Sequence, residues 1–147
     1  MNVYKSMKKF LDEVEFTYEA HEEDSLFMFQ LGTEVTHYRC ILIYHEKLDL
    51  ISLIMVPPVE APVEKQKKVA EFLTRMNYGL NLGAGEMDYA DGEIRFRLGT
   101  AILGNTEIEA ACALLLGVGA STLDNYYPGV MKVIYGDKSP KRVIEQI

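Results

Sequence analysis

Three apolar runs joined by very short connections are the feature that most constrains the fold of this chain. The runs cover Leu26 to Leu31, Val35 to Tyr44 and Leu48 to Val56, and only three residues separate each run from the next. A crossover between parallel strands needs a dozen or more residues. The three runs are therefore predicted to form an antiparallel meander.

The later two runs are apolar on both faces of the predicted sheet. Side chains alternate along a strand, and we expect one face to carry Ile41, Ile43, Ile51, Leu53 and Met55 and the other to carry Leu42, Leu50 and Ile54. Strands of this kind need cover on both sides. One layer of helices covers a single side, so apolar surface is expected to remain for a partner.

Helical spacing predicts the elements around this meander. Apolar residues from Val3 to Tyr18 recur at helical intervals, and a second helix is expected from about Val63 to Asn77. A third is expected to begin at a capping box of Thr106 and Glu109, and Pro128 should kink or end it. Ser139 followed by proline predicts a short last helix.

A β-hairpin is predicted around Asp91-Gly92, which lies between two alternating runs. A two-residue turn there would pair Asp88 with Arg95 and Glu86 with Arg97 across the strands. The element order is then α-βββ-α-ββ-α(α). We therefore expect residues 1–147 to form a single α+β domain with an antiparallel five-stranded sheet and packed helices.

The charge balance argues against nucleic acid as a partner. The formal net charge is −7, whereas nucleic-acid binding needs clustered cations. An anionic membrane surface is disfavoured for the same reason. The sequence shows no secretion signal and no apolar run of membrane-spanning length, so a cytoplasmic location is expected. Cys40 and Cys112 lie in apolar runs and are expected to be buried thiols.

We identify no catalytic, cofactor-binding or metal-binding residue from the sequence. The segment His21 to Asp24 reads as a solvated acidic loop, because adjacent residues rarely converge on one ion. The glycines of Leu116 to Ser121 lie inside a predicted helix, where a nucleotide-binding loop would need a preceding strand. No Ser, Cys or Thr stands in a nucleophile motif. The chain is therefore predicted not to be an enzyme.

An ordered set of residues resembles the YbjN family, which is labelled a bacterial sensory-transduction regulator. The set comprises Val56-Pro57-Pro58, Asn77, Gly83, Gly85, residues 91–97, Tyr126-Tyr127-Pro128, Gly136 and Ser139-Pro140. That family is similar in fold to the type III secretion chaperones, which usually dimerise. The resemblance implies a secretion-chaperone-like fold and a non-catalytic role in binding or regulation. It implies no catalytic residues.

The leading hypothesis is a chaperone-like or regulatory module that binds a protein or peptide and acts as a homodimer. Its possible interface combines sheet residues with small helix residues: Ile41, Ile43, Ile51, Leu53, Met55, Ala113, Gly117 and Ala120. Two alternatives stay open. One is a small-ligand binder or an enzyme whose site assembles from scattered residues such as Arg39 and His37. The other is a structural subunit of a larger complex.

Overall fold

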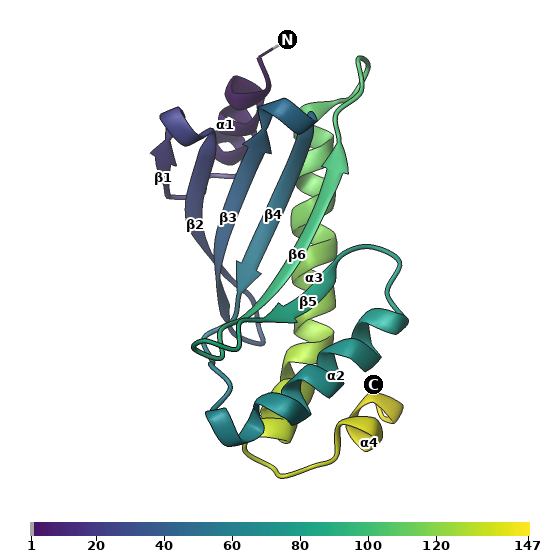
Figure 1. The fold of residues 1–147 in the computed structure, drawn as a ribbon. Helices are drawn as coiled ribbons and strands as arrows, with labels where there is room; N and C mark the ends of the chain where they lie inside the picture. The colour runs from purple at the N-terminus through teal and green to yellow at the C-terminus, as the bar shows by residue number, and fades with distance from the viewer. Residues whose placement is uncertain (1) are drawn as a thin grey trace.

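A computed structural model describes residues 2–147 and shows a six-stranded antiparallel sheet with helices packed on it (Figure 1). The helices and strands are α1 (Val3–Glu13), β1 (Tyr18–His21), β2 (Leu26–Gly32), β3 (His37–His45), β4 (Leu50–Val56), α2 (Gln66–Tyr78), β5 (Ala84–Met87), β6 (Ile94–Ala101), α3 (Ile108–Ile134) and α4 (Pro140–Glu145). The α+β class and the antiparallel sheet are as predicted, with six strands in place of five.

The sheet order is β1-β2-β3-β4-β6-β5, and every neighbouring pair is antiparallel. The predicted meander is confirmed as β2, β3 and β4. The later hairpin joins the sheet through β6, which lies beside β4. The two edge strands, β1 and β5, have four residues each, and edge strands this short limit unwanted pairing with other chains.

The sixth strand arises because the first helix is shorter than its apolar spacing suggests. Helix α1 ends at Glu13, and Glu15 then takes a left-handed conformation with φ 61°. The chain reverses there, and Tyr18 pairs with Phe29 on β2 as the first residue of β1. The predicted acidic loop is in part this strand, since His21 ends β1 before a single helical turn at Glu22–Asp24.

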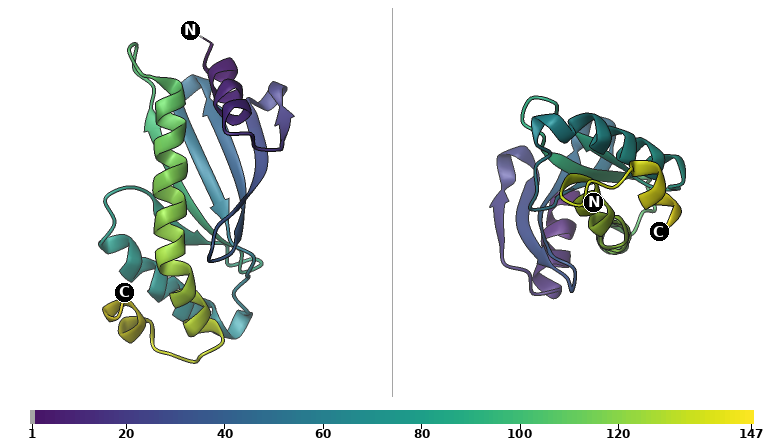
Figure 2. Two further views of the ribbon diagram at one scale, coloured as in Figure 1. Left: turned by 180° about the vertical axis from the view of Figure 1, so that it is seen from behind. Right: turned by 90° about the horizontal axis from the view of Figure 1, so that it is seen from below.

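Helices cover one face of the sheet. In Figure 1 the sheet faces the viewer and α3 lies behind it, and the view from behind in Figure 2 shows α1 and α3 on that side. Helices α2 and α4 pack beside each other near one end of α3. Helix α3 lies close to the sheet at Gly119, where a Cβ would lie 2.5 Å from the Met55 sulfur. The core is therefore confined to the helix side.

Helix α3 lacks the predicted capping box and does not end at Pro128. It begins at Ile108, and the Thr106 hydroxyl accepts a hydrogen bond from the Leu103 amide instead of capping the helix. It also continues through Pro128 to Ile134. Tertiary packing on both sides of Pro128 holds these turns, since Leu123, Tyr127 and Val130 are buried. The cap at Ser139 is confirmed, because its hydroxyl accepts from the Arg142 amide.

The hairpin forms with a longer loop than predicted. The Asp88 amide donates to the Glu93 carbonyl, so the loop has four residues, and the Asp88 carboxylate accepts from the Ala90 amide. The register therefore pairs Met87 with Ile94 and Glu86 with Arg95. The predicted pairing of Asp88 with Arg95 is wrong by two residues. An even shift keeps each side chain on its predicted face.

Candidate functional site

The predicted sheet residues of the interface lie on opposite faces. Ile51, Leu53 and Met55 are fully buried on the helix side. Ile41 and Ile43 are half-buried on the other side. The reason is the register of β3 with β4, which pairs Ile41 with Ile54 and Ile43 with Ser52. Paired residues share a face, so the prediction that Ile41 and Ile43 share one with Ile51, Leu53 and Met55 is wrong.

The side of the sheet away from α1 and α3 carries a continuous apolar surface. We call this surface the open face, and it consists of Met28, Ile41, Ile43, Leu50, Ile54 and Val56. Each of these side chains is half-buried, because it packs against its neighbours across the strands and not beneath a helix. The open face is thus an apolar sheet surface without cover from the helices of residues 2–147.

The predicted helix residues of the interface lie on the far side of the molecule. Ala113 and Gly117 are exposed on α3, and Ala120 is half-buried. Leu114 beside them is 57% exposed, and a Cβ at Gly117 would meet no atom within 4 Å. We call these four residues the α3 face. The sheet separates the α3 face from the open face, so the structure does not join the predicted residues into one patch (Figure 2).

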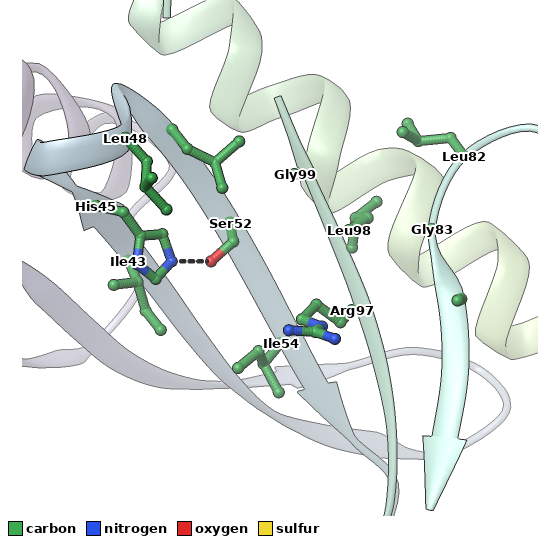
Figure 3. Close-up of a pocket in the computed structure, with 12 residues that line it drawn as sticks. Ile43, His45, Leu48, Ser52, Ile54, Leu82, Gly83, Arg97, Leu98 and Gly99 are labelled. Atoms are coloured by element: carbon green, nitrogen blue, oxygen red, sulfur yellow. Dashed lines mark hydrogen bonds between the residues drawn. The ribbon is translucent and has the colours of Figure 1, made fainter. Parts of the chain in front are cut away.

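A pocket of about 540 Å³ opens on the open face between β4, β6 and the loop before β5. Figure 3 shows Ile43, His45, Leu48 and Ser52 on one side of it and Leu82 and Gly83 on the other, with Arg97 between them. His45 Nε2 and Ser52 Oγ are 2.8 Å apart. Sequence reasoning missed this pocket, because its residues come from four segments and share no motif.

Arginine and glutamate side chains flank the pocket on the same face. Glu86 accepts from Arg95 at 2.6 Å and from Arg97 at 3.0 Å. Arg39 pairs with Glu93 at 3.2 Å. The alternative site around Arg39 and His37 is not assembled in this arrangement, because Arg39 turns to Glu93 and His37 lies exposed outside the hollow that Arg39 lines.

The two cysteines and the acidic side chains of residues 2–147 are the remaining candidates for a reactive or metal-binding group. Burial raises the pKa of the Cys40 and Cys112 thiols to about 12, which keeps them protonated and unreactive. Within residues 2–147, no three His, Cys, Asp or Glu side chains gather as a metal site. No helix in the same range is long and apolar enough to cross a bilayer.

Comparison with known proteins identifies one family and solved structures of similar fold. The YbjN family model, described as "Putative bacterial sensory transduction regulator", matches residues 4–131. No curated protein matches the sequence. The crystal structure of YbjN, "a putative transcription regulator from E. coli", matches with a TM-score of 0.62 at 10% identity, over 82% of this chain and 85% of that one.

The second similar structure is that of the ExsC-ExsE complex, with a TM-score of 0.56 at 13% identity. The match covers 84% of this chain and 91% of that one. At these identities the two structures show a shared fold. The family resemblance and the fold class predicted from the sequence are both confirmed.

Proposed function

The chain belongs to the YbjN family, and from this premise we propose that it is a non-catalytic module that binds a protein and acts as a homodimer. The open face carries this proposal. Exposed apolar patches of a few hundred Å² or more mark interaction sites, and six apolar side chains here have no helix over them. A solved structure with this fold, the ExsC-ExsE complex, is itself an assembly of two proteins.

The protein partner is proposed to lie on the open face. Ile41 and Ile54 pair at its centre, and the arginines of β3 and β6 lie around it. A partner segment with apolar side chains and a few carboxylates fits this surface, since complementary charges at the rim favour correct docking. An interface of this kind needs no catalytic group.

Two copies of the chain are proposed to meet through the α3 face. Gly117 and Ala113 allow the backbone of a second helix to approach closely, and exposed Leu114 supplies an apolar contact. A two-fold axis across α3 would bring the same residues together from both copies. The α3 face and the open face can then act independently.

A pair of variants tests both parts. Ile41→Arg with Ile54→Arg places charge on the open face, and Leu114→Arg places one on the α3 face. Purified chain serves as bait in cell extract, and light scattering measures its mass against the 16.7 kDa of one chain. We expect the first variant to lose specific partners and remain dimeric. The second should become monomeric and keep its partners.

Each variant is the control for the other. Equal partner capture by wild type and the open-face variant would refute the role of the open face. If light scattering gives wild-type protein the mass of a single chain at high micromolar concentration, the dimer is refuted. Both variants change only exposed or half-buried side chains, so both should keep the native fold. A circular dichroism spectrum like that of wild type is required for each.

A further inference from the structure

The pocket on the open face owes its depth to small residues at fixed positions. Gly99 lies on β6 opposite Ser52, and a Cβ there would lie 2.9 Å from the Ile51 carbonyl oxygen. Gly83 has φ 82°, and a Cβ there would lie 2.6 Å from the Phe96 ring. Ala84 completes the wall. Larger side chains at these positions would fill the pocket or displace its walls.

The lining of the pocket is apolar apart from one cation and one polar pair. Isoleucine and leucine side chains form most of the wall, and the lining contains no Asp or Glu. Arg97 lies in the pocket and is neutralised only in part, because Glu86 is shared between Arg95 and Arg97. Two guanidinium groups on one carboxylate leave an excess positive charge beside the pocket.

The polar pair of His45 and Ser52 has a hydrogen bond without any ligand. Ser52 is 6% exposed, and its hydroxyl and His45 Nε2 hydrogen-bond to each other. When two polar groups hydrogen-bond to each other, an apolar group can pack against them without breaking a hydrogen bond. The packing then carries no desolvation penalty from an unpaired polar group. An apolar chain can therefore lie over Ser52, between Ile43 and the backbone of Gly99.

The strand register gives the length of the pocket. Arg97 pairs with Ile54 at one end, and Ala101 pairs with Leu50 four residues further along β6. Four steps of roughly 3.3 Å span about 13 Å. The length, the apolar wall and the single cation at one end fit an extended aliphatic chain with one anionic head group.

We propose that this pocket binds a medium-chain aliphatic monocarboxylate of about eight carbons, a ligand within the usual size range of such pockets. The carboxylate pairs with Arg97, and the tail lies along Ile54, Ile43 and Leu50 toward Leu48. A cationic amphiphile is excluded by Arg97. This site goes beyond the proposed protein binding, and purified chain without any partner is sufficient to test it.

The test uses three probes with the same tail: octanoate, 1-octanol and octyltrimethylammonium. Each is titrated into ¹⁵N-labelled protein up to the solubility limit of octanol, in the low millimolar range, which detects millimolar affinity. We expect octanoate to shift the amides of Ser52, Arg97 and Gly99. Its affinity should exceed that of octanol by at least about fivefold, because a charge-assisted bond adds to the tail contact. The ammonium probe should not bind.

Three variants distinguish binding in the pocket from general electrostatic attraction of octanoate to the arginines of the open face. Arg97→Gln should reduce octanoate affinity to that of octanol, and Ala84→Leu should weaken both. Arg39→Gln is the matched control, because it removes the same charge from the same face outside the pocket. The amide spectra themselves show whether each variant is folded.

Several results would overturn the proposal. These are no binding by octanoate, a preference over octanol below the stated factor, and shifts centred away from the pocket. An equal loss of affinity in Arg39→Gln and Arg97→Gln would also reject it. None of these results depends on partner capture or on the oligomeric mass measured by light scattering. Failure of this proposal is therefore distinct from failure of the proposed function.

Discussion

Replacing Tyr38 with Phe removes one hydroxyl from the interior and leaves the ring in place. Tyr38 is 0% exposed, and its hydroxyl donates to Asp124 Oδ1 at 2.6 Å. The Thr33 hydroxyl donates to the same oxygen at 2.8 Å. This contact ties β3 and the turn before it to the middle of α3. It adds a polar contact to the apolar packing that holds the long helix on the sheet.

The expected loss follows from the chemistry of this bond. A hydrogen bond to a charged group contributes roughly 1.5–3 kcal/mol, and Asp124 keeps Thr33 as a donor in the variant, so we expect a loss of about 2 kcal/mol. For a chain of this size each kcal/mol lowers the melting temperature by roughly 2–4 °C, which gives a decrease of about 4–8 °C.

Urea unfolding followed by circular dichroism measures this loss, with Tyr44→Phe as the matched control. Tyr44 donates to Asp49 Oδ1 at 3.0 Å through the same pair of groups, but in an exposed position. The Tyr44 variant should lose less than half as much stability. Combining Tyr38→Phe with Asp124→Ala should cost less than the sum of the two changes, because each change removes the same hydrogen bond. Equal losses in the Tyr38 and Tyr44 variants would refute the reasoning.

Two further predictions concern the core. Burial raises the pKa of Cys40 and Cys112 from 9.0 to about 12, so the folded chain keeps protons that the unfolded chain releases. The free energy of unfolding should fall as pH rises from about 9 to 12, and fall less steeply in a variant with both cysteines replaced by alanine. Gly119→Ala should lose about 1 kcal/mol net, because overpacking against Met55 costs roughly 1–3 kcal/mol and helix propensity returns about 1. A more stable variant in urea would contradict the close approach of α3.

The parts of the fold that were predicted correctly depend on short-range features of the sequence. The three-residue connections required the antiparallel meander, and the hydroxyl of Ser139 before a proline marked the last helix. The YbjN resemblance was carried by turn residues and glycines spread along the chain. The sixth strand had no such signal, since Tyr18 also fits the helical spacing and Glu15 is not a residue that marks a left-handed turn.

The candidate site was harder to predict because it depends on register. Alternation assigns the residues of one strand to two faces, but it does not say which face of β3 continues into which face of β4. The pairing of Ile41 with Ile54 settles this in the structure. The pocket was missed for a related reason, since Gly99 and Ala84 create it by having no side chain and only a methyl group, respectively.

The positions of the two uncovered surfaces determine which assemblies are possible. The open face and the α3 face lie on opposite sides of the sheet. A dimer through α3 would therefore leave two open faces pointing away from each other, and each would accept its own partner or its own ligand. A dimer through the open faces would cover Ile41, Ile54 and the pocket at once, and would leave Leu114 exposed. Only the first arrangement leaves the open face of each chain free for binding within the dimer, so we expect complexes with two chains and two partners.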